Sequence, residues 1–271
     1  MEYAIFNGQI IPKGKATISI ADKGYFFDFS VYSSIKVIQG KMFFPDYHIS
    51  RLLESARVID LGHQFNKKQI LNWLESVVKK NKIKDVLLRL VLIGDPDNDS
   101  QAKIYIFPVT GLTFYPDKVY REGIKVITYH GQRRYPNSKT KDLLLGFLAY
   151  REAKRQNANE ALLIDSDGNI REGTQTNFFA IKGQTLIMPP KSKVLEGVTK
   201  KILLAAVKGQ FKIKEADIPF KKLKNYDEFF ITSTTRNVVP IRQIDRLVLG
   251  SVFPKVKVIQ QLFKEYYRKH F

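Results

Sequence analysis

Apolar and polar residues follow strand spacing at the start of the chain and helix spacing directly after it. β-Branched and apolar residues flank two turn-forming pairs, which predicts hairpins. Two later segments carry apolar side chains three and four residues apart, as on one face of a helix. The elements expected in this half are a hairpin at Asn7-Gly8 followed by a strand over residues 16–20, a hairpin at Gln39-Gly40, helices over residues 46–61 and 67–80, and strands over residues 85–93 and 102–109.

The second half also mixes strands, hairpins and helices. It predicts a strand over residues 123–130, a helix over residues 143–156, hairpins at Asp167-Gly168 and Gly183, a helix over residues 198–209, a strand over residues 227–235 and a closing helix over residues 253–271. Because strands precede helices in each half instead of alternating with them, the pattern favours two α+β domains over a doubly wound sheet. We expect a smaller domain over residues 1–115, an interdomain segment over residues 116–136 and a larger domain over residues 137–271.

Composition excludes several classes of chemistry. The chain has 271 residues and 44% hydrophobic content, enough for one large core or two smaller ones. It has no cysteine, which excludes disulfides, thiolate nucleophiles and iron–sulfur clusters, and its four histidines lack metal-ligand spacing. The N-terminus lacks a signal-peptide pattern and no segment is long and apolar enough to cross a bilayer, so we expect a cytoplasmic protein without a membrane partner or a bound metal.

The formal net charge of +19 raises a nucleic-acid-binding protein as an alternative from another class. However, the lysines are spread over the whole chain and no recognised nucleic-acid-binding motif accompanies them. A solvated basic surface is the favoured interpretation.

Successive segments of the chain offer three groups that pyridoxal 5'-phosphate needs: an amine, a carboxylate and a phosphate-binding helix start. An amine that condenses with the aldehyde of this cofactor must also serve as a base. Lys139 and Lys141 both satisfy this chemistry, and strand alternation cannot choose between them because residues two apart share a face. Composition alone assigns neither lysine.

The other candidates each have an ordinary structural alternative. Glu172, just beyond a hairpin turn, could face a protonated ring nitrogen, or it could be a solvated strand end. Thr199 at a helix start could bind phosphate together with backbone N–H groups, or simply lie in the first turn of the helix. Arg51 could hold the phosphate by a bidentate pair or lie on the surface, and the hydroxyls of residues 232–235 could add further donors.

The order of these segments resembles the class IV pyridoxal-phosphate aminotransferases, the group that contains D-amino acid aminotransferase, branched-chain aminotransferase and aminodeoxychorismate lyase. The resemblance covers nearly the whole chain. It is carried by DKGYFFDFSVYSSIKVIQGK, YHISRL, EALLIDSDGNIREGTQTNFFAI, LEGVTKKILL and DEFFITSTTRNVVPI, which are similar to the family's early strand pair, H-x-x-R-L helix, E-G-(T/S)-x-x-N hairpin, L-x-G-(I/V)-T-R helix start and T-(A/T)-x-x-x-P turn.

The resemblance implies a role for each candidate. It implies a fold-type IV enzyme with pyridoxal phosphate in the interdomain cleft, Lys139 as the lysine that forms the aldimine, and a homodimer. It implies cofactor contacts from Arg51, Glu172, Leu195, Val198, Thr199 and Thr234. It implies substrate contacts from Tyr32, Ser34 and Thr235, and charge and location add Arg89, Arg133 or Arg134 as the group that binds a substrate carboxylate.

Departures from the family pattern concern the substrate. Leu92, Ile93 and Gly94 stand where D-amino acid enzymes have T-R-G, and Ser33 and Ser34 stand where the family commonly has glutamate and glycine. We therefore expect an aminotransferase that moves an amino group between an amino acid, branched-chain or similar, and a 2-oxo acid. The alternative within the enzyme class is aminodeoxychorismate lyase, which would release 4-aminobenzoate and pyruvate.

Overall fold

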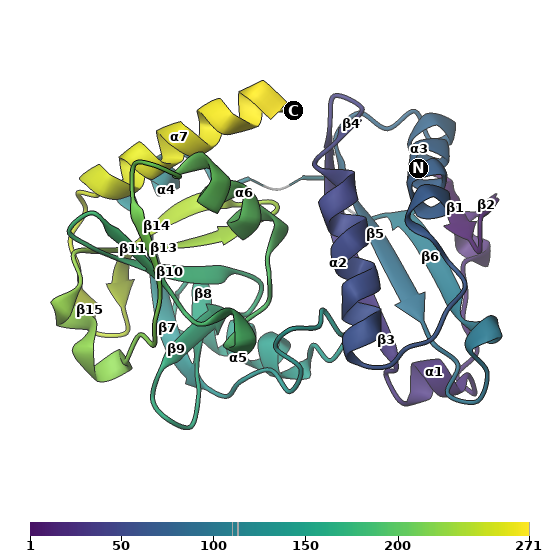
Figure 1. Cartoon of the computed structure of the whole chain (residues 1–271), viewed down its shortest axis with the longest axis horizontal. Helices are drawn as coiled ribbons and strands as arrows, with labels where there is room; N and C mark the ends of the chain where they lie inside the picture. Colours follow the sequence, from purple (N-terminus) through teal and green to yellow (C-terminus); the bar gives the residue numbers. More distant parts are fainter. Residues whose placement is uncertain (110, 113, 271) are drawn as a thin grey trace. The chain divides into compact units, whose positions relative to one another are not determined.

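The structure, a computed structural model, describes residues 1–109, 111–112 and 114–270. It divides the chain into two compact units, one built from residues 1–112 and 137–142 and the other from residues 113–136 and 143–270. The chain thus leaves the first unit, returns to it for six residues and leaves it again. Figure 1 labels the elements of both units.

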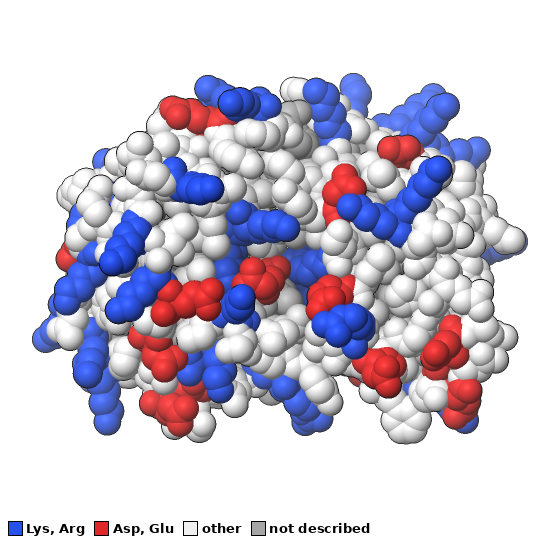
Figure 2. Space-filling model, in the orientation of Figure 1, with Lys and Arg blue, Asp and Glu red and all other residues white. Residues whose placement is uncertain are grey.

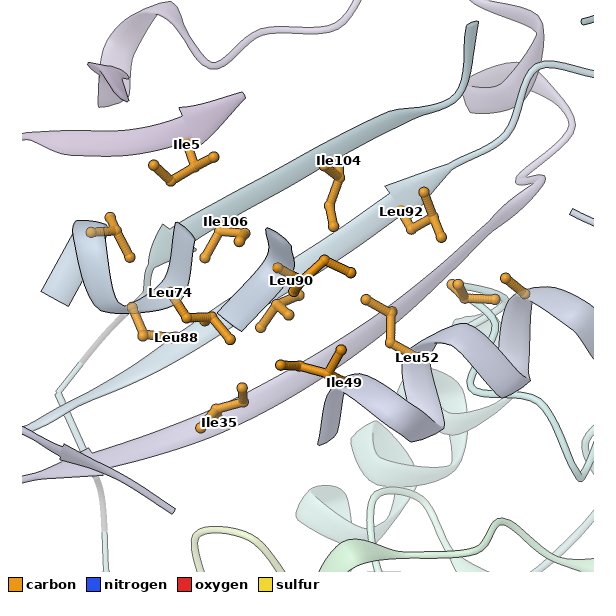
Figure 3. Close-up of a cluster of buried hydrophobic side chains, with 14 of the residues drawn as sticks. Ile5, Ile35, Ile49, Leu52, Leu74, Leu88, Leu90, Leu92, Ile104 and Ile106 are labelled. Carbon is orange, nitrogen blue, oxygen red and sulfur yellow. The ribbon is translucent and has the colours of Figure 1, made fainter. Parts of the chain in front are cut away.

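The first unit is an antiparallel sheet with two long helices. Its strands lie in the order β2-β1-β6-β5-β3-β4. Their bounds are β1 Tyr3–Phe6, β2 Gln9–Pro12, β3 Ser30–Ile38, β4 Lys41–Met42, β5 Val86–Ile93 and β6 Lys103–Pro108, and the helices are α1 Lys23–Phe26, α2 Pro45–Val58 and α3 Lys67–Lys80. The apolar stripes of α2 and α3 pack on one face of this sheet, as Ile49, Leu52 and Leu74 do against the strand side chains in Figure 3.

The second unit is built around a larger mixed sheet in the order β12-β11-β10-β13-β14-β7-β8-β9, with β15 paired to β14. Because β9 also pairs with β10, six of these strands close into a ring. The strand bounds are β7 Ile124–His130, β8 Glu160–Ile164, β9 Ile170–Gly173, β10 Asn177–Lys182, β11 Thr185–Met188, β12 Lys212–Glu215, β13 Glu228–Ser233, β14 Asn237–Ile244 and β15 Leu247–Val248. The helices are α4 Asp117–Glu122, α5 Leu144–Arg155, α6 Val198–Ala206 and α7 Pro254–His270.

Most of the expected elements are present, and the two-domain α+β fold class is confirmed. The turns at Asn7-Gly8 and Gln39-Gly40 have positive φ at both residues, which two-residue hairpins of this kind require. The segment expected to be an interdomain connection contains α4 and β7, and residues 137–142 pack with the first unit.

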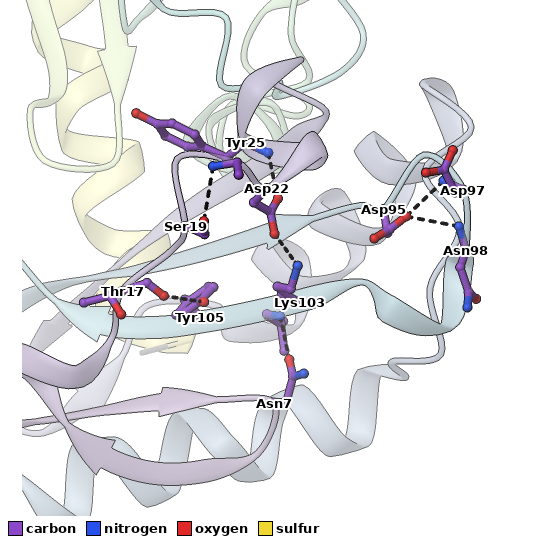
Figure 4. A network of polar contacts seen from close by, with 12 residues as sticks. Asn7, Thr17, Ser19, Asp22, Tyr25, Asp95, Asp97, Asn98, Lys103 and Tyr105 are labelled. Atoms are coloured by element: carbon purple, nitrogen blue, oxygen red, sulfur yellow. Dashed lines mark hydrogen bonds and ion pairs between the residues drawn. The ribbon is translucent and has the colours of Figure 1, made fainter.

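The expected strand over residues 16–20 is wrong. This segment makes no ladder in the described structure, and the hydroxyl of Tyr105 donates a hydrogen bond of 2.9 Å to the carbonyl of Thr17 (Figure 4). Asp22 then caps α1 by accepting from the N–H of Tyr25 at 2.9 Å, and its carboxylate pairs with Lys103. Side-chain contacts therefore hold this segment where backbone pairing was expected.

Charge is distributed over the molecular surface. On the face drawn in Figure 2, lysine and arginine side chains lie among aspartates and glutamates instead of forming one continuous patch. Among the residues that the structure describes, none of the helices has the length and apolar character that crossing a membrane requires.

Lys36 on β3 is a buried amine within the first unit. Its side chain is 1% exposed, and its Nζ lies 4.1 Å from the centre of the Phe43 ring. Burial lowers the pKa of Lys36 from 10.5 to about 7. Desolvation of the charged form is the cause of this shift.

We expect the stability of the protein to rise with pH between about 7 and 10.5, because in this window the unfolded chain keeps the Lys36 proton and the folded chain does not. The gain is at most about 1.4 kcal/mol per pH unit. Denaturant titrations at pH 7 and pH 9 should show that Lys36→Met loses roughly 2 kcal/mol of this gain, whereas the exposed-site control Lys79→Met keeps it. Equal pH dependence in wild type and Lys36→Met would contradict the assignment.

Candidate functional site

Lys139 lies on a short segment that pairs with the start of β3. The N–H of Tyr32 donates to the carbonyl of Lys139 at 2.9 Å, and the N–H of Lys141 donates to the carbonyl of Ser30 at 3.1 Å. Between them, Thr140 forms an antiparallel bridge with Val31. The backbone of this segment is therefore fixed by strand pairing within the first unit.

The two candidate lysines have different surroundings. The Nζ of Lys141 lies 3.4 Å from the carboxylate of Asp28 and 5.0 Å from the centre of the Tyr25 ring. The Nζ of Lys139 instead lies 4.6 Å from the centre of the Tyr32 ring. The amine of Lys141 thus lies beside a carboxylate, and the amine of Lys139 lies against the Tyr32 ring.

Three of the expected substrate contacts lie together on the first unit's sheet. Ser34 is directly opposite Arg89 in the β3–β5 register, and Tyr32 lies one step along on the same face. The guanidinium of Arg89 is 5.7 Å from the centre of the Tyr32 ring. Arg89 Nε is buried and has no hydrogen-bond partner among the described residues, so this group is available to a ligand.

Arg51 on α2 is oriented by two buried side chains. Its Nη2 donates a hydrogen bond of 3.0 Å to the hydroxyl of Ser33, and the same oxygen lies 3.1 Å from His48 Nδ1. Burial, together with the positive charges of Arg51, Lys139 and Lys36, lowers the pKa of His48 well below 6.5. A neutral imidazole at this point leaves the positive charge on the arginine.

Glu172 lies near the end of β9 in the second unit and is buried. Its carboxylate accepts a hydrogen bond of 3.3 Å from the N–H of Leu195 and lies 3.8 Å from Arg133 Nη1. Asn177 is opposite Glu172 in the sheet, and its amide donates to the carbonyl of Leu195 at 2.8 Å. Two strands and the segment before α6 therefore meet at this carboxylate.

The first turn of α6 lies beside this group. Its N-cap, Gly197, has no side chain to cap the helix, and a Cβ built there would lie 2.0 Å from Asn177 Oδ1. The hydroxyls of Thr199 and Thr232 are buried and have no hydrogen-bond partner among the described residues. The uncapped N–H groups and the Thr199 hydroxyl at this helix start, with the Thr232 hydroxyl on β13, are donors of the kind that a phosphate group needs.

Thr234 and Thr235 lie in the turn after β13, and the next residue, Arg236, anchors this turn. Arg236 donates a hydrogen bond of 2.8 Å to Glu160, a carboxylate that is completely buried. Thr174 also donates to Glu160, at 2.5 Å. This ion pair ties the turn after β13 to the hairpin that carries Glu172.

The structure groups the candidates within each unit. In the first unit, Lys139, Tyr32 and Arg89 are linked by ring contacts, and Ser34 lies in the same register. In the second, Glu172 contacts Leu195, which precedes the helix start of Val198 and Thr199. Arg134 is exposed, and the neighbouring Arg133 makes the contact to Glu172.

Several contributing residues had not been singled out from the sequence. They are Ser55, Glu160, Asn177 and Arg236. Ser33 had entered only as a departure from the family pattern, and His48 only as one of four histidines without metal-ligand spacing. The signal available for two of them was position within a motif: His48 opens H-x-x-R-L, and Asn177 closes E-G-T-x-x-N. The pairing of Glu160 with Arg236 spans 76 positions, so no local pattern indicates it.

Comparison with known proteins gives one consistent group. A family model described as amino-transferase class IV matches residues 30–244. A D-alanine aminotransferase from Bacillus licheniformis is 32% identical over 258 residues, covering 92% of this chain and 91% of the relative.

Two solved structures share the fold. The branched-chain amino acid aminotransferase of Escherichia coli has a TM-score of 0.88 at 23% identity, covering 98% of this chain and 94% of that one. A hypothetical aminotransferase from Mycobacterium tuberculosis in its PLP-bound form has a TM-score of 0.85 at 18% identity, covering 99% and 100% of the two chains.

We expect the Glu160–Arg236 pair to behave as a coupled unit in stability measurements. Glu160→Gln or Arg236→Met leaves one buried group without its opposite charge and should cost about 3–5 kcal/mol, whereas the double variant should cost less than the sum. Urea unfolding of the four proteins measures this coupling. Glu54→Gln, which opens the exposed pair with Arg57, is the matched control and should change little. Additive losses in the cycle would show that the two groups act independently.

Proposed function

Because the chain belongs to the class IV aminotransferases, we propose that Lys139 is the residue that binds pyridoxal 5'-phosphate covalently and moves the proton during amino transfer. The family uses this cofactor, and its substrates are amino acids and 2-oxo acids. The roles of individual residues are our proposal. The observation that carries it is the grouping of Glu172, held by the Leu195 N–H, with the uncapped helix start at Thr199.

When bound, pyridoxal 5'-phosphate supplies a ring that accepts electrons from the substrate's α-carbon. Lys139 Nζ would first hold the cofactor and, once displaced by the substrate amine, carry the proton to and from that carbon. Glu172 would hold a proton on the ring nitrogen. The N–H of Leu195 and the guanidinium of Arg133 orient its carboxylate.

The start of α6 offers donors for the phosphate group of the cofactor. The buried hydroxyl of Thr199 has no hydrogen-bond partner within residues 1–109, 111–112 and 114–270, and the N–H of Val198 lies in the same uncapped first turn. Thr234 would add a hydroxyl from the turn after β13, and the family resemblance adds Arg51 of the first unit to the proposed phosphate contacts. The donors of the second unit fit a phosphate dianion in kind, and Leu195 would pack its apolar side chain on the ring.

Substrate contacts are proposed for Tyr32, Ser34, Arg89 and Thr235. Arg89 would bind a carboxylate, because its guanidinium stacks near Tyr32 and retains a buried N–H without a partner among the described residues. Arg134 is a weaker candidate because its side chain is exposed. We propose a branched-chain or similar amino acid as the donor. A cytoplasmic location stays part of the proposal.

We further propose a homodimer. Three large apolar side chains in the first unit are strongly exposed: Ile20 at 84%, Phe26 at 73% and Phe27 at 66%. The two phenylalanine rings lie edge to face, 5.4 Å apart. Contiguous exposed aromatic groups of this kind are typical of protein interfaces.

Lys139→Ala should abolish covalent cofactor attachment. After incubation with pyridoxal 5'-phosphate and reduction with borohydride, wild type and the matched control Lys141→Ala should carry the cofactor mass on one peptide, and Lys139→Ala should not. Amino transfer from a branched-chain donor should fall by at least about a thousandfold in Lys139→Ala only. A reduced adduct on the peptide of Lys139→Ala would end the assignment.

Replacing both exposed rings, Phe26→Ser with Phe27→Ser, should shift the protein toward a monomer. Sedimentation equilibrium of wild type and the double variant measures this shift, because loss of apolar area weakens an interface of this kind. The exposed Val248 on β15, replaced by serine, is the control and should leave the mass unchanged. A monomeric wild type would remove the dimer from the proposal.

A further inference from the structure

Helix α2 carries a polar stripe that runs along the helix beside its apolar face. The stripe consists of His48, Arg51 and Ser55, spaced three and four residues apart, so that they share one side of the helix. His48 and Arg51 meet at the hydroxyl of Ser33. Ser55 is completely buried and contacts a different part of the first unit.

Ser55 accepts two hydrogen bonds from the segment that contains Lys139. Its hydroxyl oxygen accepts a hydrogen bond of 3.0 Å from the N–H of Lys139. Its carbonyl accepts a hydrogen bond of 2.8 Å from the hydroxyl of Ser138. One helical residue therefore binds two consecutive residues of the short segment.

The hydrogen bonds to β3 do not include the N–H of Lys139. Tyr32 of β3 donates to the carbonyl of Lys139, and Ser30 of β3 accepts from the N–H of Lys141. The N–H of Lys139 is directed to the helix instead, where the Ser55 hydroxyl oxygen accepts its hydrogen bond. The position of this residue along the strand is set by β3, and its orientation about the strand depends on Ser55.

We infer that Ser55 is a positioning residue for Lys139, which sets the direction in which the Nζ of Lys139 leaves the backbone. The inference rests on the proposed function only for its catalytic consequence. The contact itself is a property of the polypeptide chain, so it can be tested without cofactor. Tyr32, whose ring lies 4.6 Å from the Nζ, fixes the far end of the same side chain.

Ser55→Ala removes the acceptor and adds no bulk. In the cofactor-free protein, amide hydrogen exchange of Lys139 should become roughly five- to tenfold faster, while exchange within the core of α2 stays unchanged. Ser55→Thr keeps the hydroxyl and should restore slow exchange. Ser76→Ala, which removes a helical hydroxyl that donates to Asn72 on α3, is the matched control and should leave Lys139 unaffected.

A kinetic measurement separates positioning from general stability. In Ser55→Ala the rate of covalent cofactor attachment and kcat should each fall roughly tenfold, while KM changes less than twofold, because the lysine is misdirected and the substrate contacts are intact. The thermal midpoint, compared with Ser76→Ala, shows whether the loss follows unfolding. A fall in kcat that is fully accounted for by a smaller folded fraction at the assay temperature would overturn the inference.

The two proposals fail in different ways. If Lys139→Ala still carries the reduced cofactor, the proposed function fails, yet the exchange result for Ser55→Ala stands. If Lys139 exchanges equally fast in wild type and Ser55→Ala, Ser55 positions nothing and the proposed function is untouched. Should Ser55→Ala not fold, wild type alone decides: an unprotected Lys139 amide would contradict the hydrogen bond on which the inference depends.

Discussion

Backbone pairing between residues 139–141 and residues 30–32 is the constraint on which the candidate chemistry depends. A lysine side chain has four rotatable bonds, so the position of its amine is only as definite as the backbone that carries it. Here the main chain is held by strand hydrogen bonds and by a helical serine. The Tyr32 ring then limits the side chain itself. Ordinary sheet geometry thus fixes the backbone that carries the Lys139 amine.

In the second unit the corresponding constraint is the closure of six strands into a ring. Closure places the start of β10 beside the end of β9, so Asn177 and Glu172 face each other. The segment before α6 is drawn to this point by hydrogen bonds to both residues. A helix start without a capping side chain lies there, together with two buried hydroxyls that have no hydrogen-bond partner in the described part of the chain. Leaving such groups unpaired is costly unless a ligand binds them.

Periodicity predicted the strands and helices well because both depend on local burial, but it failed where long-range contacts decide. Residues 16–20 have strand composition, yet the contact from Tyr105 holds them outside the sheet. β14 was not anticipated, since Pro240 lies within it and proline normally argues against a central strand. Lys139 and Lys141 could not be separated by spacing, because their difference lies in Asp28 and Tyr32, which are distant in sequence. Motif order, in contrast, was enough to identify the family.

The path of the chain has a consequence for how this protein can be divided. Residues 113–136 belong to the second unit, residues 137–142 to the first, and the chain then re-enters the second. A fragment ending at residue 112 would therefore lack the segment that pairs with β3 and carries Lys139. Neither unit is one continuous stretch of sequence, so recombination between relatives that exchanges whole units needs three crossover points instead of one.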